Sequence, residues 1–470
     1  MSENLKLKIK KLNIMKPSFL SILFGIAYAP GILIMKRLFF TVNYADRNGL
    51  IILSIIFAII YFGIIFFFSQ MLKESQDTPL FIMMALVIGA VLAIRVGFLD
   101  FKSGDYILYL SDWMNHLRFY PGFSSLGQNI GDYNLPYIYI LFVLSRINLP
   151  DLYLIKIVSI IFDVVLGIYG LKLVGLKYKS NWIQLGAFIG IFITPTVILN
   201  SSAWSQCDSI WAAFTLAALY YMLKNKSITA VILWTIGFSF KMQAIFFAPV
   251  ILLFVLLKRV KVAHLFLIIP VFFAWFIPAL LAGRSFVNML GIYFRQVGTS
   301  RALSVNGPTF TNFFEQSLTP AEEGLFGLIA PVSIFLAGTI LLILLCYTYA
   351  VKDKLGTGEI IHVSLLMNVA VIFFLPQMHE RFFYLADILA IIYGFYYPKK
   401  WYIPLSLIII SMLTYGNYLF RDTSNVLNVG QLTLLMFVII FILAKDFYLS
   451  TKPSIEIREG WSDTQDKSVK

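Results

Sequence analysis

Long apolar runs recur along the whole chain, and they constrain its fold more than any other feature. Many contain roughly 17 to 25 residues, enough for an α-helix to cross a hydrocarbon core about 30 Å thick. The 470 residues are 59% hydrophobic and 13% charged, unlike the composition of soluble domains. The sequence therefore predicts an all-α polytopic membrane protein with about 14 transmembrane helices. The expected spans are approximately residues 17–36, 49–71, 80–99, 152–174, 183–199, 208–223, 228–240, 243–257, 263–282, 323–350, 359–375, 382–397, 402–419 and 430–448.

Basic residues form short clusters between these runs, and the clusters predict the topology. The net charge of +13 could indicate nucleic acid, but clusters confined to connections between spans are typical of cytoplasmic loops, so we expect no nucleic-acid partner. The apolar segment 134–149 is short for a span. If it does not cross, one side of the membrane holds all the clusters, at Lys6–Lys16, Lys73, Lys177, Lys224, Lys258, Lys352 and Lys399. We therefore predict cytoplasmic termini and a juxtamembrane helix at 134–149.

The segments left on the other side carry the unusual chemistry. They are the external loops 100–151 and 284–322, with shorter stretches around Asp208, Lys241 and His379. The loops on the basic side are bland by comparison. The sequence thus predicts a multi-pass protein of the plasma (cytoplasmic) membrane whose active site lies on the extracytoplasmic face.

Two aspartates stand where the third span ends, in "GDYILYLSDW". Asp105 and Asp112 are seven residues apart, which places both on one face of a helix. Solvated carboxylates at a helix end are the simpler interpretation. Aromatic residues frame the pair, however, including Tyr109 and Trp113, and such residues build both interfacial belts and sugar platforms. A carboxylate in a partly dry pocket can have a raised pKa and act as a general base.

Two further polar stretches add candidate sugar contacts. "GDYNLPYIY" carries Asp132 and Asn134, which fit a turn before the juxtamembrane helix and could also contact a sugar. "NSSAWSQCDS" gathers Trp204, Gln206 and Asp208 in a tight external turn. Capping of the next span would explain one such residue, whereas the cluster favours a role in a site.

Lone cations at the outer ends of spans predict a phosphate site. Lys241 interrupts an apolar stretch, and a cation at membrane depth is either functional or snorkels to the interface. "MHERFFY" places Arg381 at another span end, where a guanidinium can bind phosphate through two hydrogen bonds; a Glu380–Arg381 structural network is the alternative. The long loop 284–322 is expected to act as a lid. The predicted contacts of a donor lipid phosphate are Lys241, Gln243, His379, Arg381, Arg295 and Arg301.

Two charged residues lie within one predicted span, and the histidines form no metal-binding motif. Lys156 and Asp163 share a helical face and are predicted to form a buried structural pair. The four histidines include no HExxH motif or paired spacing, so the sequence carries no zinc signature. No cofactor is expected with certainty, and a requirement for a divalent metal ion is left open.

The ordered set of motifs resembles the GT-C superfamily of integral-membrane glycosyltransferases. It runs "SGDYILYLSDW", "GDYNLPYIYILFVLSRI", "IKIVSIIFDVV", "ILNSSAWSQCDSIW", "GFSFKMQAIFFAP" and "MHERFFYLAD", and it looks closest to bacterial relatives of the enzyme that adds the second mannose of the GPI anchor. This resemblance implies a catalytic module at 80–400. A two-span addition (1–79) precedes it, and C-terminal spans (401–448) and a cytoplasmic tail (449–470) follow it.

The resemblance also implies a reaction. GT-C enzymes transfer sugars from polyprenyl- or dolichyl-linked donors and carry an essential aspartate in the first external loop, a role that maps onto Asp105. A second acidic residue in a later external loop maps onto Asp208. Leu135 stands where relatives often have proline, and the resemblance does not fix the sugar. The implied partners are a polyprenyl-phosphate-linked sugar, a glycan or lipid-linked acceptor and membrane lipids, with inversion at C1 expected from direct displacement.

Two other classes of protein fit the same composition. A Wzy-like polysaccharide polymerase or ligase would depend on external arginines, namely Arg284, Arg295 and Arg301, more than on Asp105. A flippase for lipid-linked sugars would need cations along a continuous central cavity and no Asp105. The dependence of activity on Asp105 separates the three.

Overall fold

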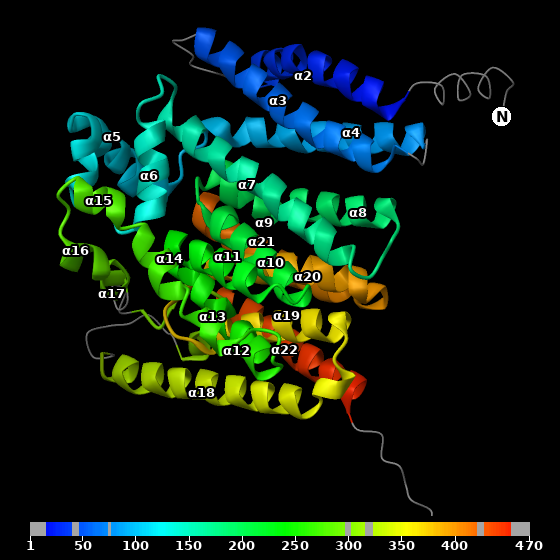
Figure 1. Ribbon diagram of the computed structural model, residues 1–470, viewed down its shortest axis with the longest axis vertical. Coiled ribbons are helices and arrows are strands. Elements are labelled where there is room, and N and C mark those ends of the chain that lie inside the picture. Colours follow the sequence, from blue (N-terminus) through cyan, green and yellow to red (C-terminus); the bar gives the residue numbers. More distant parts are fainter. Residues whose placement is uncertain are drawn as a thin grey trace, which may run out of the picture.

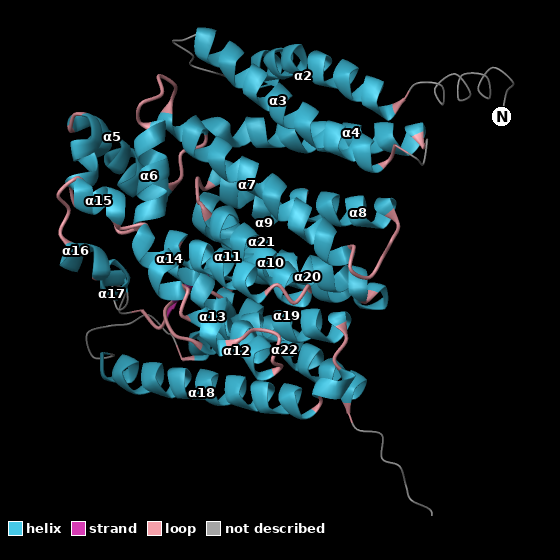
Figure 2. Ribbon diagram, viewed as in Figure 1, coloured by secondary structure: helices cyan, strands magenta, loops and turns pink. Residues whose placement is uncertain are grey.

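Helices dominate the computed structural model, as Figure 2 shows. The structure describes residues 16–39, 47–73, 77–296, 302–314, 323–420 and 427–452; the basic segment before Lys16 and the predicted tail beyond Lys452 lie outside them. Within these ranges, nine helical segments are long and apolar enough to cross a membrane, or ten if one bent pair counts as a span. The chain is therefore an all-α polytopic membrane protein, and the finer count of about 14 crossings stays a prediction.

Each expected span coincides with helical structure. Ten of them match α2 (Pro17–Phe39), α3 (Arg47–Met71), α4 (Thr78–Gly97), α7 (Asp151–Val174), α10 (Asp208–Leu223), α11 (Ser227–Phe240), α18 (Glu323–Ala350), α19 (Thr357–Phe374), α21 (Tyr402–Phe420) and α22 (Val429–Thr451). The shorter α20 (Tyr384–Tyr396) and the pair η5 (Met242–Phe247) and α12 (Ala248–Leu256) match two more.

Two expected spans are broken. The first consists of α8 (Asn181–Phe192) and a bent continuation, α9 (Pro195–Ile198) with η4 (Leu199–Ala203), at an angle of 54°. Pro195 stands at the bend, where its missing N–H and fixed φ interrupt the helix. The second comprises α13 (Val262–Leu265), α14 (Ile268–Ala274) and α15 (Ile277–Leu281), and Pro270 and Pro278 lie within it.

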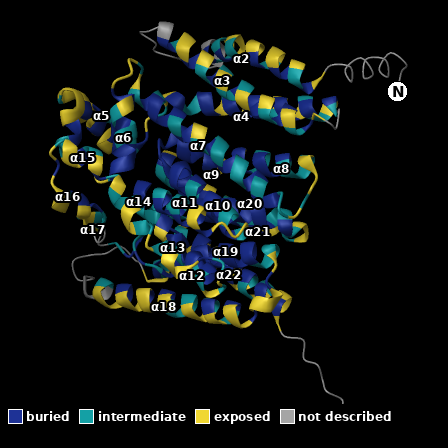
Figure 3. Ribbon diagram, viewed as in Figure 1, coloured by how far each residue is buried: buried dark blue, intermediate teal, exposed yellow. Residues whose placement is uncertain are grey.

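The helices pack in successive layers. In Figure 1, α2, α3 and α4 lie together along one side, and α18 lies at the opposite side. One apolar core joins α2–α4 to α7 and α8, and a larger core extends from α7 and α8 over α5, α6, α10–α12 and α18–α22. Figure 3 shows buried positions gathered in the central helices and exposed positions along α18, where Phe335 and Leu342 are exposed. Exposed apolar side chains on a spanning helix are suited to contact with lipid.

The chain direction separates two ends of the bundle. The helix α10 begins at Asp208 and ends beside Lys224, and α11 returns from there to Lys241. At the basic end, connections far apart in sequence meet: Lys177 donates to the Tyr396 carbonyl at 2.5 Å, and Lys400 pairs with Asp446 at 2.6 Å. We call the opposite end the site end, because it holds Asp208, Lys241 and the other residues treated below.

Short helices cover the site end. These are α5 (Ser111–Phe119), η3 (Gly122–Gly127), α6 (Leu135–Leu144), α16 (Phe286–Leu290) and α17 (Ile292–Gln296). The ten residues of α6 extend about 15 Å, half of a hydrocarbon core, so the helix is too short to cross, and its juxtamembrane position stays a prediction. The Asn134 side chain caps it by accepting the Leu135 N–H at 2.9 Å. Arg118 of α5 pairs with Asp151 and ties this cover to α7.

One short parallel strand pair crosses the site end. The strand β1 (Ser304–Val305) pairs with β2 (Met378–His379), and the Gln377 N–H donates to the Leu303 carbonyl at 2.7 Å. Gly307 lies so close to this pair that an added Cβ would stand 2.5 Å from the Met378 carbonyl oxygen. Two parts of the expected lid are described: residues 284–296, which contain α16 and α17, and residues 302–314, which the strand pair ties to the bundle. Residues 297–301 and 315–322 lie outside the described ranges.

The predicted Lys156–Asp163 pair is wrong. Asp163 pairs instead with Arg95 of α4 at 2.7 Å, and both side chains are fully buried. The Lys156 ammonium donates to three backbone carbonyls just after α4, those of Phe98 at 2.8 Å, Leu99 at 3.2 Å and Phe101 at 2.6 Å. A shared helical face brings two residues near each other, but the packing of α4 against α7 offers both of them better partners.

Candidate active site

Asp105 lies at the centre of a hydrogen-bond network at the site end. Its Oδ2 accepts from Trp204 Nε1 at 3.0 Å, from Arg381 Nη1 at 2.7 Å and from the Gln206 amide. Its Oδ1 accepts from the Tyr418 hydroxyl at 2.5 Å. Burial alone would raise the pKa of Asp105, but the Arg381 charge and the donated hydrogen bonds outweigh burial and hold this pKa below its usual value.

Local structure around the end of α4 places Asp105. The three carbonyls held by Lys156 close the chain into a turn, η1 (Phe98–Asp100). Ser103 then donates to the Trp204 carbonyl at 2.6 Å and accepts from the Tyr106 N–H at 3.2 Å. A buried lysine at the carbonyl-rich end of a helix thus supports the segment that carries the carboxylate.

A second ion pair lies directly behind the first. Lys241 donates to Asp208 at 2.5 Å and to Gln206 Oε1 at 3.0 Å. Asp208 also accepts from Asn200 and Trp211, both at 2.9 Å. Gln206 therefore bridges the two pairs, because its amide donates to Asp105 while its carbonyl oxygen accepts from Lys241.

The backbone around the site departs from regular geometry. Two π-helices, η2 (Tyr106–Leu110) and η4, lie beside the network. Segments of this kind are frequent at functional sites. Ser205, between Trp204 and Gln206, has a φ of 65°, and Gln377 beside β2 has a φ of 63°. A positive φ in a residue other than glycine is uncommon, and such residues cluster at active sites.

A cavity of about 400 Å³ opens beside this network. Its walls combine carboxyl, cationic and aromatic groups. The lining residues are Asp105, Leu108, Tyr109, Leu110, Trp113, Asp132, Tyr133, Gln206, Val305, His379, Glu380, Arg381 and Tyr418. Gly131 has a φ of 66°, and an added Cβ would stand within 3.0 Å of the Trp113 ring, so this position needs glycine to bring Asp132 and Tyr133 over the aromatic wall.

His379 and Glu380 enter the cavity from the loop before α20. Burial and then the Arg381 charge lower the pKa of His379 to about 3, so its imidazole is neutral at pH 7. Burial raises the pKa of Glu380 to about 7, against the opposing effect of Arg381. His379 can therefore contribute a hydrogen bond but no charge, and Glu380 changes its charge near neutral pH.

The structure brings seven of the predicted site residues to the cavity wall: Asp105, Tyr109, Trp113, Asp132, Gln206, His379 and Arg381. Trp204, Asp208 and Lys241 lie behind that wall, where they hold Asp105 and Gln206. Asp112 is exposed on α5, and Asn134 caps α6. Neither of these two residues lines the cavity.

The remaining predicted phosphate contacts are elsewhere. Gln243 lies in η5 away from the cavity lining, and Arg295 is exposed and donates to the Asn288 carbonyl at 2.8 Å. Arg301 lies outside the described residues. Lys241 and Arg381 belong to one network, as a shared phosphate site would require, but Lys241 is already neutralised by Asp208.

Three polar residues of the cavity wall were not among the predicted site residues: Tyr133, Glu380 and Tyr418. Tyr133 donates to Gln206 Oε1 at 2.9 Å, and its ring lies under the Lys241 ammonium, 5.1 Å from the centroid. Tyr418 was hidden inside an apolar span, and no local pattern marks it. Glu380 entered the sequence analysis only in the alternative of a structural network with Arg381, and the structure shows Arg381 bonded to Asp105 instead.

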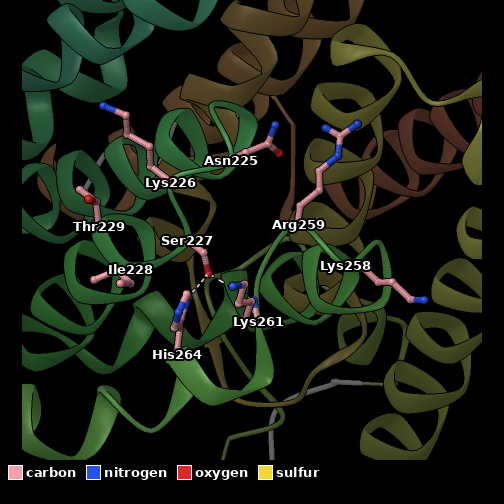
Figure 4. Close-up of a pocket in the computed structure, with 9 residues that line it drawn as sticks. All are labelled: Asn225, Lys226, Ser227, Ile228, Thr229, Lys258, Arg259, Lys261 and His264. Atoms are coloured by element: carbon pink, nitrogen blue, oxygen red, sulfur yellow. Dashed lines mark hydrogen bonds between the residues drawn. The ribbon is translucent and has the colours of Figure 1, made fainter.

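A second pocket, of about 430 Å³, lies at the basic end (Figure 4). Lys226, Lys258, Arg259, Lys261 and His264 line it, and the Ser227 hydroxyl contacts His264 at 2.7 Å and accepts the Lys261 N–H at 3.2 Å. In Figure 4, the Lys226 and Lys258 side chains extend away from Ser227. Clusters of this kind are typical of connections on the cytoplasmic side.

Among the described residues, no group of three or more His, Cys, Asp or Glu side chains could hold a metal ion. Compared with known proteins, the chain matches no family model, and no curated protein matches it significantly. The candidate site is therefore described from its own geometry.

Proposed function

We propose that the protein is a membrane glycosyltransferase that moves a sugar from a polyprenyl-phosphate donor to a glycan or lipid-linked acceptor. One observation carries the proposal: Asp105 and Arg381 meet in an aromatic-walled cavity at the ends of membrane-spanning helices. A donor anchored by its lipid tail presents its phosphate and sugar near the membrane surface. The end of a bundle of spans is where such a substrate would react.

The groups around the cavity match the parts of this donor. Arg381 donates a hydrogen bond from Nη1 to Asp105, while its Nε has no partner in the described part of the structure. A guanidinium with donors to spare can bind phosphate oxygens. Trp113 and the half-exposed Tyr109 provide the aromatic faces on which sugars stack.

Transfer would proceed by displacement at C1. The acceptor hydroxyl oxygen bonds to C1, the bond from C1 to the phosphate oxygen breaks, and that oxygen keeps the electron pair. Hydrogen bonds from Arg381 and His379 would stabilise the departing phosphate. A single displacement inverts the configuration at C1.

The residues that line the cavity favour this class over the two alternatives. A Wzy-like polymerase would depend on Arg284, Arg295 and Arg301; neither Arg284 nor Arg295 lines the cavity, and Arg301 lies outside the described residues. A flippase would have no need to hold Asp105 with four donors. The extracytoplasmic location of the cavity is part of the proposal, because the basic connections lie at the other end of the helices.

The experiment is mass spectrometry of cell-envelope glycans and lipid-linked glycans in cells with and without the protein. Loss of one sugar residue from one glycan in its absence would support the proposal. Complementation with Asp105→Asn should fail. Complementation with Asp112→Asn should succeed, because this exposed carboxylate of the same external segment does not line the cavity. An unchanged glycan profile in the deletion strain would contradict the proposal.

A further inference from the structure

Glu380 is a buried carboxylic acid without a hydrogen-bond partner in any other described residue. It is 1% exposed, no other described residue bonds either carboxyl oxygen, and the one hydrogen bond that lowers its pKa is to its own backbone. Buried polar atoms are nearly always paired, so two orphaned oxygens on one side chain call for an explanation. Because Glu380 lines the cavity, a substrate that fills the cavity can supply the missing donor.

Asp105 also lines the cavity, but its carboxyl oxygens are fully hydrogen-bonded. Four donors from Trp204, Gln206, Arg381 and Tyr418 already occupy its two oxygens. A carboxylate stabilised in this way is a weak base. A proton acceptor needs a free lone pair within reach of the reacting hydroxyl, and Glu380 has free lone pairs where Asp105 has few.

The surroundings of Glu380 keep it near its titration point. The charged and titratable groups that interact with it are Arg381, Asp105 and the phenols of Tyr415 and Tyr418 on α21. Burial raises the pKa of Glu380 to about 7 and exceeds the lowering by Arg381. A catalytic base works best when its pKa lies near the operating pH.

We propose that Glu380 accepts the proton of the acceptor hydroxyl during sugar transfer, a role that rests on the proposed glycosyltransferase function. The ionised Glu380 takes the proton as the hydroxyl oxygen bonds to C1. The electron pair of the broken bond leaves with the polyprenyl phosphate. Asp105 then acts as a positioning residue, which fixes Arg381 and Gln206 at the cavity wall.

Asp132 is the rival for this role. It also lines the cavity, and desolvation raises its pKa. Its residue is exposed, however, so water can satisfy its oxygens and it needs no substrate to do so. Asp132→Asn is therefore the matched control for Glu380→Gln, since each change replaces a cavity carboxylate by its amide.

The experiment follows release of polyprenyl phosphate from a panel of short-chain polyprenyl-phosphate hexoses by the purified full-length protein. Water serves as the acceptor, so the natural acceptor need not be known. The wild-type rate should fall as the pH drops below about 7, because the base becomes protonated. Glu380→Gln should lower turnover by about 10² to 10⁴, with donor affinity unchanged within about twofold, and its residual rate should not depend on pH in this range. Asp132→Asn should keep the pH dependence of the wild type.

The outcomes separate the role of Glu380 from the proposed glycosyltransferase function. If the wild type is active and Glu380→Gln matches it, or if Asp132→Asn is the variant that loses the pH dependence, Glu380 is not the proton acceptor, while the glycosyltransferase function stands. If the wild type releases polyprenyl phosphate from no donor, both proposals fail. Should Glu380→Gln not fold, Glu380→Asp replaces it: reduced turnover with a shifted pH dependence supports the proposal, and a rate and pH dependence equal to those of the wild type overturn it.

Discussion

Two arginine–carboxylate pairs in this molecule share one geometry and differ in their surroundings. Arg381 lies 2.7 Å from Asp105, and Arg95 lies 2.7 Å from Asp163. The side chains of the first pair are 14% and 13% exposed at the cavity, and those of the second pair are 0% exposed. Arg95 is further held by Ser201 at 2.8 Å and by the Phe192 carbonyl at 2.9 Å.

We infer from this difference that the Arg95–Asp163 pair is structural, and we propose that the Asp105–Arg381 pair is functional. Charge buried in a membrane protein marks either role, so neither the residue types nor the distance decides between them. Access to a cavity decides, because only the Asp105–Arg381 pair can meet a substrate. Substitutions in the two pairs should therefore affect different observables.

The largest expected effect is on turnover in Asp105→Asn. The amide keeps the shape of the side chain but loses the negative charge that holds Arg381. We expect turnover to fall by about 10² or more, which corresponds to roughly 3 kcal/mol. The folded protein should persist, as judged by thermal unfolding in detergent, because water in the cavity can solvate Arg381. Loss of folding equal to that of Asp163→Asn would contradict the distinction between the pairs.

Asp163→Asn should instead destabilise the protein. Removing one partner of a sealed pair leaves an uncompensated charge, at a cost of about 3 to 5 kcal/mol. Thermal unfolding in detergent should show a large loss of stability, and the fraction that stays folded should turn over donor at the wild-type rate. A stable variant with impaired turnover would place Asp163 in the reaction.

Glu380→Gln should change how stability depends on pH. The folded-state pKa of Glu380, about 7, lies above the ordinary value of 4.5. Stability from this group is therefore fully present below pH 4.5 and is lost as the pH rises through about 7. The wild type should lose up to about 3 kcal/mol over this interval relative to Glu380→Gln, which has no charge to bury. Unfolding temperatures of both proteins across this pH range test the sign, and a constant difference would refute it.

Arg381→Lys should weaken the donor site. A lysine keeps the positive charge, but it lacks the planar guanidinium that can donate hydrogen bonds to Asp105 and to a phosphate at the same time. We expect a loss of donor affinity of about 1.5 to 3 kcal/mol, the range for hydrogen bonds to charged groups. Arg95→Lys is the matched change in the sealed pair, and it should leave donor affinity of the folded fraction unchanged.

Tyr109→Ala should have the smallest effect. Its side chain lines the cavity and is about half exposed, at 52%, so it would contribute stacking on the sugar of about 1 kcal/mol or a several-fold change in donor affinity. Phe119 is an exposed aromatic residue of α5 that does not line the cavity, at 80% exposure. Phe119→Ala should therefore leave affinity unchanged, and equal effects of both substitutions would remove the aromatic wall from the donor site.

The sequence predicted the helices well and the partners poorly. Hydropathy is a property of local stretches, so every expected span coincides with helical structure. Asp105, Gln206 and Arg381 each stood out as polar residues at span ends, but nothing local linked residues 276 positions apart. Asp163 pairs with Arg95 rather than with Lys156 because α4 and α7 meet at this point in the fold. The sequence alone does not give that contact. No other described residue bonds the Glu380 carboxyl oxygens, because Arg381 donates to Asp105 rather than to Glu380. The sequence does not show which of the two carboxylates Arg381 bonds.

The most direct measurement of the central claim is release of polyprenyl phosphate by purified wild-type protein, Asp105→Asn and Asp112→Asn from one polyprenyl-phosphate hexose donor. We expect release by the wild type, equal release by Asp112→Asn, and a loss of about 10² or more in folded Asp105→Asn. Equal release by folded Asp105→Asn and the wild type would contradict the claim, because the cavity beside the Asp105–Arg381 pair would then not be the site of the reaction.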